Sequence, residues 1–220
     1  MPTLVVVDGH LMPKAPLEAF AAGVVDVPLV ISSMAQEPGQ APGNLFNASL
    51  LSPAKFVEQL GRYFDGFLGV GFGARLGALY ANVTAKGTQL SFDSIVADVG
   101  VGCGNRQLAA AAAAGFSRSK VYSVVNAVGG GPFYAYHGRD LQSATKDKGE
   151  QGKRIRAWWR EFGESGAVAA WRSANGGNAE EVLVTNVLTD SDVLQQQDYR
   201  EDVCALWRAS GAGPEFWWSN

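Results

Sequence analysis

Two residues of types that act together in catalysis, Glu37 and His137, each follow an apolar stretch of this 220-residue chain. Glu37 comes shortly after residues 24–32, which are rich in valine and isoleucine, and His137 comes after residues 121–125. Short apolar runs of this kind predict strands that are buried on both faces. Catalytic groups of open α/β sheets lie on loops at the carboxyl ends of the strands, so we expect these two side chains to meet there.

The chemistry that a glutamate and a histidine perform together is general base catalysis. The imidazole takes a proton from a serine hydroxyl, while the carboxylate fixes the tautomer of the ring and stabilises the imidazolium. Glu37 precedes His137 in the chain, which is the order of the last two members of an α/β-hydrolase triad. The other histidine, His10, follows Asp8-Gly9 in a turn, and we expect it to be structural or exposed.

Helices are expected between the strands, and strands that alternate with helices imply a parallel sheet covered on both faces. The sequence offers two or three strands, which would leave long apolar edges unpaired, so the sheet is expected to be incomplete. The other expected elements are a helix over 52–63, a loop or an irregular helix start over 66–77, a glycine turn and a close-packed helix over 98–114, a helix over 151–162, a strand over 182–187 and a helix over 199–207.

Several short motifs occur along the chain in one order: Asp8-Gly9 with Pro13, Val27-Pro28-Leu29-Val30-Ile31 leading to Gln36-Glu37, Asp98 with Cys103, His137-Gly138-Arg139-Asp140, Trp159-Arg160-Glu161-Phe162, and Cys204-Ala205-Leu206-Trp207. In this order they resemble the C-terminal part of the cholinesterase-like type B carboxylesterases, over nearly the whole chain. The resemblance implies that residues 1–220 are the C-terminal part of one α/β-hydrolase domain, with few parallel strands flanked by helices.

The resemblance also implies a site and a reaction. Glu37 and His137 would be the triad acid and histidine of a serine esterase, which cleaves a small carboxylic ester through an acyl-enzyme and uses no cofactor. Cys103 and Cys204 would form a disulfide, and closing a loop of about a hundred residues stabilises a fold by about 4 to 5 kcal/mol in the chain-entropy model. The sequence departs from the family at Pro38, where the family has glycine, and proline favours an extended conformation of the residue before it.

The triad nucleophile is not found in these residues. The family's serine lies in a Gly-x-Ser-x-Gly turn, and none of the 220 residues belongs to such a motif. Loss of the nucleophile costs on the order of a millionfold in turnover, so we expect the chain alone to be essentially inactive. An N-terminal half of the same enzyme would supply the serine, in keeping with an apolar run at residues 4–7 that suggests a start partway through a fold.

The two cysteines, together with the N-glycosylation acceptors Asn47 and Asn82, favour a secreted or extracellular protein. No apolar run approaches the roughly 20 residues that span a bilayer, and the N-terminus lacks the pattern of a signal peptide. The formal net charge is −3 and charged residues make up 18% of the chain, so no nucleic-acid-binding surface is expected.

Three alternative hypotheses remain open at this stage. The chain could be a catalytically inactive, cholinesterase-like adhesion or binding module. Residues 95–105, with glycines from Gly100 to Gly104, resemble the strand, turn and helix start that bind S-adenosylmethionine in Rossmann-like methyltransferases. Cys103, flanked by glycines near a helix start, could itself be a nucleophile activated by His137.

Overall fold

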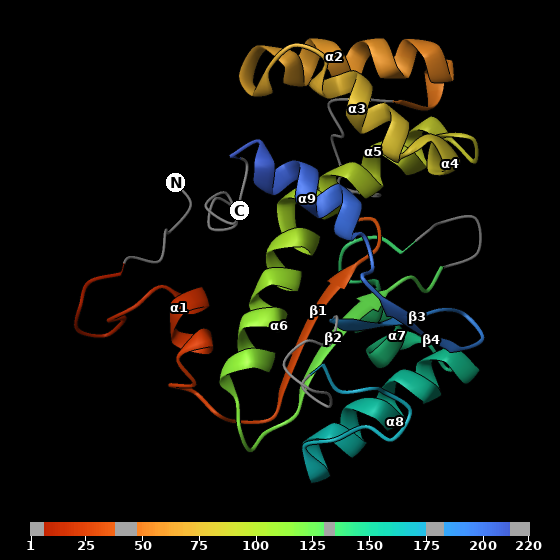
Figure 1. Ribbon diagram of the computed structural model, residues 1–220. Coiled ribbons are helices and arrows are strands. Elements are labelled where there is room, and N and C mark those ends of the chain that lie inside the picture. The colour runs from red at the N-terminus through yellow and green to blue at the C-terminus, as the bar shows by residue number, and fades with distance from the viewer. Residues whose placement is uncertain (1–6, 38–47, 130–134, 175–182, 212–220) are drawn as a thin grey trace.

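A four-stranded sheet lies at the centre of the molecule, which we describe from a computed structural model (Figure 1). The structure describes residues 7–37, 48–129, 135–174 and 183–211. The strands, in their order across the sheet, are β1 (Leu29–Met34), β2 (Val121–Asn126), β3 (Val184–Leu188) and β4 (Val193–Gln197). The first three strands are parallel, and β4 runs antiparallel to β3. The expected parallel sheet is confirmed, with one antiparallel edge strand added.

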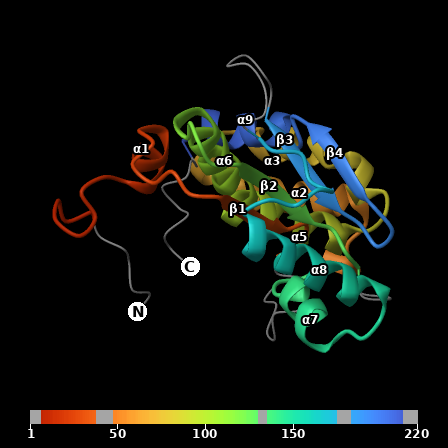
Figure 2. The same ribbon diagram turned by 90° about the horizontal axis from the view of Figure 1, so that it is seen from below.

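Helices cover both faces of the sheet, with α6 (Cys103–Gly115) and α9 (Glu201–Ala209) on one side and α8 (Glu150–Ser165) on the other (Figure 2). Strand β2 is buried along its whole length, and its side chains alternate between the two layers. Tyr122 packs in a cluster with Ile155 and Trp158 of α8, whereas Val121 packs with Ala112 of α6. The continuous apolar run at 121–125 is therefore a strand buried on both faces, as predicted.

Several helices lie in the connection between β1 and β2. Together with α9 they enclose a core cluster in which the rings of Phe72 and Trp207 lie 5.1 Å apart and those of Phe64 and Trp207 5.5 Å apart. The remaining helices are α1 (Pro16–Ala21), the 3-10 turn η1 (Ala48–Leu50), α2 (Pro53–Leu68), α3 (Phe72–Leu79), α4 (Ala81–Thr84), α5 (Thr88–Ala97), the π-helical turn η2 (Asp98–Gly102) and α7 (Arg139–Lys146).

The first strand is shorter than the apolar run that predicted it. β1 begins at Leu29 rather than at Val24, and the residues before it lie in an exposed connection. Pro28 has no N–H to give to a strand ladder. Asp26 is bound elsewhere, since its carboxylate accepts hydrogen bonds from the backbone N–H groups of Ser117, Arg118 and Ser119 at 2.9–3.2 Å. The start of the run is therefore held as a loop against the α6–β2 turn.

The prediction of a loop or irregular helix start over 66–77 is wrong for most of that segment. Helix α2 continues to Leu68, and α3 begins at Phe72, so only a short turn separates them. Gly73 allows close packing of the two helices, because a Cβ there would lie 2.2 Å from the Gly61 backbone nitrogen. Gly69 and Gly71 form the turn itself, with φ of 95° and 83°.

Most of the other expected elements are confirmed. The helices expected over 52–63, 151–162 and 199–207 correspond to α2, α8 and α9, and the last expected strand corresponds to β3. Of the two neighbouring tryptophans on α8, Trp158 is buried and Trp159 is 48% exposed. Strand β4 was not predicted, because four of its five residues are exposed and it has no apolar alternation.

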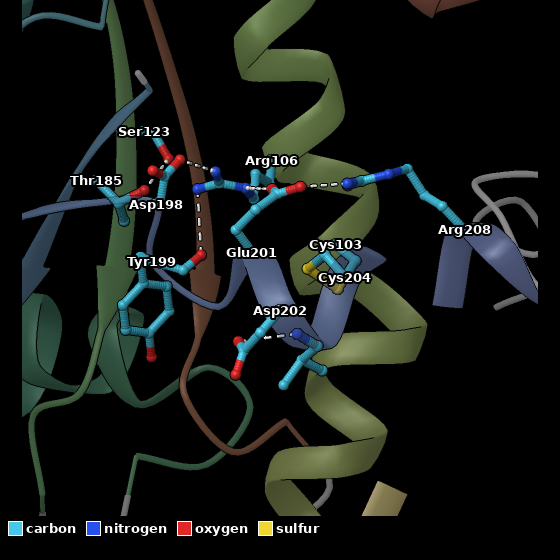
Figure 3. A network of polar contacts seen from close by, with 11 residues as sticks. Cys103, Arg106, Ser123, Thr185, Asp198, Tyr199, Glu201, Asp202, Cys204 and Arg208 are labelled. Atoms are coloured by element: carbon cyan, nitrogen blue, oxygen red, sulfur yellow. Dashed lines mark hydrogen bonds and ion pairs between the residues drawn. A yellow bond between two sulfur atoms is a disulfide. The ribbon is translucent and has the colours of Figure 1, made fainter. Parts of the chain in front are cut away.

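Helix α9 is fastened to α6 by a covalent bond and by an ionic cluster (Figure 3). Cys103 and Cys204 form a disulfide, as expected, and both residues are buried. Beside it, Arg106 of α6 donates to Glu201 at 2.9 Å and to Asp198 at 3.1 Å, with only 11% of its side chain exposed. None of the described helices has both the length and the apolar character needed to cross a bilayer.

Candidate active site

Glu37 lies on a short loop that continues from the carboxyl end of β1. Its side chain is 14% exposed, and its Oε1 atom accepts a hydrogen bond from the backbone N–H of Met34 at 2.9 Å. The last residue of the strand thus holds one oxygen of the carboxylate, which leaves the other oxygen, Oε2, to face a partner. Pro38, which favours an extended conformation of Glu37, lies outside the described residues.

The loop after β2 runs alongside the Glu37 loop and brings His137 to it. Three backbone hydrogen bonds join the two segments: Ala35 N–H donates to the oxygen of Asn126 at 2.9 Å, Gln36 N–H to that of Ala135 at 3.0 Å, and His137 N–H to that of Glu37 at 3.0 Å. The first of these bonds continues the pairing of β1 and β2, and the other two join Gln36 and Glu37 to residues 135 and 137. The backbone bonds at Gln36 and Glu37 therefore hold the His137 segment beside the Glu37 loop.

The two side chains are in contact. Nδ1 of His137 lies 2.5 Å from Oε2 of Glu37. A carboxylate can only accept hydrogen bonds, so Nδ1 carries the proton in this contact. In the neutral imidazole Nε2 then carries the lone pair. The imidazole is 85% exposed, whereas the carboxylate is mostly buried. A buried acid that orients an exposed imidazole is an arrangement that can accept a proton from an incoming hydroxyl group.

The imidazole is carried on a tight turn that leads into α7. Arg139 N–H donates to the oxygen of Tyr136 at 3.0 Å, and Gly138 has φ 73° and ψ 10°. These are the values of the third residue of a type II turn, a position that requires a positive φ and so favours glycine. His137 is the second residue of that turn. We did not single out Gln142 from the sequence, although it accepts hydrogen bonds from Tyr136 and Arg139 on either side of the histidine.

A cavity between the sheet and the α6–α9 layer is not lined by Glu37 or His137. It has a volume of about 20 Å³ and is lined by apolar side chains and by polar ones such as Ser123, Thr185 and Arg106. A space of this size holds about one water molecule and is too small for an ester substrate.

The structure places the other candidate residues apart from this pair. His10 is exposed in a turn after Asp8, whose carboxylate accepts from the backbone N–H groups of His10 and Met12, as expected. Asn82 is exposed on α4, and Asn47 lies outside the described residues. The hypothesis of a Cys103 nucleophile is wrong, because its sulfur is bonded to Cys204.

The methyltransferase hypothesis is also wrong. It requires a strand before the glycine turn, but residues 95–97 are the last turn of helix α5, and the chain continues through η2 into α6 without a strand. The apolar residues Ile95 and Ala97 are buried because that helix lies in the core. A short apolar run can form a buried helix or a buried strand, and its periodicity alone does not distinguish them.

No protein-family model and no curated protein matches this sequence. Its structure is similar to the crystal structure of EstA from Aspergillus niger, with a TM-score of 0.61 and 16% sequence identity. The match covers 94% of this chain and 44% of EstA, so the chain spans less than half of that protein's length. With its mixed sheet covered by helices on both faces, the chain therefore has the fold of part of an α/β-hydrolase.

Proposed function

We propose that this chain is the part of a carboxylic ester hydrolase, of the cholinesterase-like type B family, that carries the triad acid and histidine. The observation that carries the proposal is the 2.5 Å contact between Glu37 Oε2 and His137 Nδ1 at the carboxyl ends of two parallel strands. In the proposed reaction Nε2 of His137 takes the proton of a serine hydroxyl as that oxygen attacks the ester carbonyl. Glu37 stabilises the imidazolium that forms.

The proton then passes from the imidazolium to the leaving alcohol, and an acyl-enzyme remains. In the second half of the reaction His137 takes a proton from water, which attacks the acyl group. The imidazolium then returns this proton to the serine oxygen as the bond to the serine breaks and the acid is released. The fold similarity to the esterase EstA supports a substrate of the carboxylic ester class. No cofactor is proposed for this reaction, because the serine, histidine and acid carry out the proton transfers and the acyl transfer themselves.

The serine itself would come from polypeptide beyond these 220 residues. Two observations support this part of the proposal. The chain matches 44% of EstA and contains no Gly-x-Ser-x-Gly. Within the described residues β1 pairs with β2 alone, so the edge of the strand that leads to Glu37 is where further strands of the sheet could add.

The test is labelling with a serine-directed organophosphate, applied to the complete gene product and to this chain alone. We expect the complete product to be labelled and the chain alone to stay unlabelled. In the complete product, His137→Ala should slow labelling by several orders of magnitude, and Glu37→Gln by roughly 10⁴-fold, because the wrong tautomer is then held toward the serine. His10→Ala, which alters the other histidine, should leave the rate unchanged.

Three results would overturn the proposal. One is labelling and ester hydrolysis by the chain alone, since these 220 residues contain no Gly-x-Ser-x-Gly nucleophile. The second is labelling of His137→Ala at the rate of the unaltered product. A complete product that contains no reactive serine would instead favour the inactive binding or adhesion module.

We further propose that the protein is secreted and glycosylated. The buried disulfide suits an oxidising compartment, and Asn82, the first residue of an Asn-x-Thr acceptor, is exposed. The Asn47 acceptor belongs to the same proposal. Mass mapping of the protein isolated from its natural source should find glycan at these asparagines, and unmodified asparagines with free thiols would contradict it.

A further inference from the structure

The orientation of His137 depends on the turn that carries it more than on contacts of the ring. With 85% of its side chain exposed, the imidazole has little packing around it, and its contact with Glu37 is a single hydrogen bond. A rotation of the Tyr136–Arg139 turn would move Nδ1 away from the carboxylate. The bond from His137 N–H to the Glu37 oxygen anchors this turn at one residue, and the two ends of the turn must also be held if Glu37 and His137 are to act together.

The first and fourth residues of the turn bind the same atom. Tyr136 donates its hydroxyl proton to Oε1 of Gln142, and Arg139 donates from Nη1 to that oxygen at 2.9 Å. Gln142 lies on the first helical turn after the histidine and is partly buried. One amide oxygen thus joins the residues on both sides of the His137-Gly138 pair.

The helix that carries Gln142 is itself fixed to α8. Arg156 of α8 donates from Nη1 to the backbone oxygen of Asp147 at 2.7 Å and to that of Ala144 at 3.2 Å, which binds the last carbonyls of α7. The helices also approach closely at Gly152, where a Cβ would lie 2.2 Å from the Asp147 oxygen. Gln142 therefore projects from a rigid support.

We propose that Gln142 is a positioning residue for His137: by binding Tyr136 and Arg139 together, it holds the turn so that the imidazole keeps its hydrogen bond to Glu37. This inference rests on the proposed function, in which His137 is the general base. Among the described residues, Gln142 makes no hydrogen bond to the imidazole or to the Glu37 carboxylate, so its proposed effect passes through the turn.

The test uses the whole 220-residue chain and the fact that it has only two histidines. Two-bond nitrogen–proton NMR spectra of ¹⁵N-labelled protein, at a pH at which both imidazoles are neutral, report which ring nitrogen carries the proton. We expect His137 to be protonated mainly at Nδ1 and the exposed His10 to show the mixture of a solvated imidazole. His10 is thus an internal standard in every spectrum.

Gln142→Ala should shift His137 toward the tautomer mixture of His10, with the Nδ1–H to Nε2–H ratio falling roughly fivefold, the factor that corresponds to one ordinary hydrogen bond. Gln142→Glu keeps an oxygen that both donors can reach, so it should preserve the ratio. Gln196→Ala, which removes an exposed glutamine on β4, is the matched control. Tyr136→Phe removes one of the two donors and should give an intermediate shift.

An unchanged His137 tautomer in Gln142→Ala would overturn the inference and leave the proposed function intact. An equal shift in Gln196→Ala would also overturn it, because the effect would then not be specific to the turn. If Gln142→Ala does not fold, the His137 tautomer ratios of Tyr136→Phe and Gln142→Glu test the inference in its place. If His137 of the unaltered chain shows the same mixture as His10, the Glu37–His137 pair fails, and the proposed function fails with it.

Discussion

At the scale of single residues, the two side chains of the candidate site differ in how firmly they are held. Glu37 is bound at both carboxylate oxygens, Oε1 by the Met34 N–H and Oε2 by the imidazole. His137 is exposed and is bound at Nδ1. The acid is therefore the fixed partner and the histidine the accessible one, which suits a base that must meet a hydroxyl from outside the described residues.

Asp26 is a second carboxylate whose contacts determine local structure. Burial alone would raise its pKa, but hydrogen bonds from Ser119, Ser117 and Arg118 outweigh burial and lower the pKa well below the ordinary value of 3.8. A carboxyl group with a lowered pKa in the folded state stabilises the fold above its unfolded pKa. That stabilisation is lost as the pH falls below about 4 and through the folded pKa.

We therefore predict that Asp26→Asn lowers the melting temperature at pH 7. The asparagine amide has one acceptor oxygen, whereas the N–H donors of residues 117–119 now share the two oxygens of a carboxylate. The difference from the unaltered chain should shrink as the pH falls from about 4 toward 2, since the acid form of Asp26 also loses these bonds. Thermal unfolding followed by circular dichroism between pH 7 and pH 2 measures both effects. Glu58→Gln, in an exposed pair with Arg62, is the control and should change little. A difference that stays constant with pH would contradict the argument.

The contact of Glu37 with His137 could be anticipated from the sequence because it depends on topology. Both residues follow predicted parallel strands, and parallel strands place their carboxyl ends at one edge of the sheet. The role of Gln142 could not be anticipated, since it depends on how far a side chain reaches across a specific turn. The nearest signal is that Arg139 and Gln142 are three residues apart on a helix.

At the scale of elements, glycine has two different roles in this chain, and the sequence does not separate them. Gly69 and Gly71 allow a positive φ between α2 and α3, whereas Gly73 allows the same two helices to touch. The turn is held by Asp65, whose carboxylate accepts from Gly71 N–H at 3.0 Å and Gly73 N–H at 2.8 Å. A glycine-rich segment thus forms a helix pair rather than the expected loop.

We predict opposite effects for two glycine substitutions in these helices. Gly73→Ala should destabilise the fold by about 1 to 3 kcal/mol, because its methyl group would meet backbone atoms of α2 and force the helices apart. Gly66→Ala, which adds a methyl group in open space on α2, should stabilise by about 0.5 to 1 kcal/mol through helix propensity. Urea unfolding of both variants measures the difference. Equal effects would show that α2 and α3 do not pack as closely as described.

Strand β4 and helix α5 were not predicted because neither shows the hydrophobic period by which strands and helices are recognised in a sequence. Strand β4 is an exposed edge, so it lacks the apolar alternation by which half-buried strands are recognised, and only the Asp190-Ser191-Asp192 turn before it hints at a hairpin. Helix α5 has no exposed residue, and its polar Ser91, Asp93 and Ser94 are buried, so polar and apolar residues do not separate onto two faces. By contrast, α2 has a capping Ser52, Pro53 at its first position and a clear apolar face, and it was predicted.

At the scale of the whole molecule, the disulfide closes a long covalent loop. Cys103 and Cys204 are 101 residues apart, and the segment between them includes β2, β3 and the histidine turn. A crosslink over such a distance removes many conformations from the unfolded chain, more than it changes the folded state. The disulfide is thus expected to stabilise the entire sheet rather than one helix pair.

We predict that replacing both cysteines by serine lowers the free energy of unfolding by about 4 to 5 kcal/mol, as expected for a loop of about a hundred residues. Urea unfolding of the oxidised chain, the reduced chain and the double variant measures this difference. The reduced chain and the double variant should agree with each other. An oxidised chain no more stable than the double variant would contradict the prediction.

The outer edge of β1 has a practical consequence for work with this chain. Among the described residues, the carbonyl oxygen of Ser32 is bound by Asn105 of α6, but no strand lies beside β1 on that side. A bare strand edge can template the strand of another molecule. Purified samples should therefore scatter light increasingly as they are concentrated, and a charged substitution such as Ser32→Lys should keep them clear for longer.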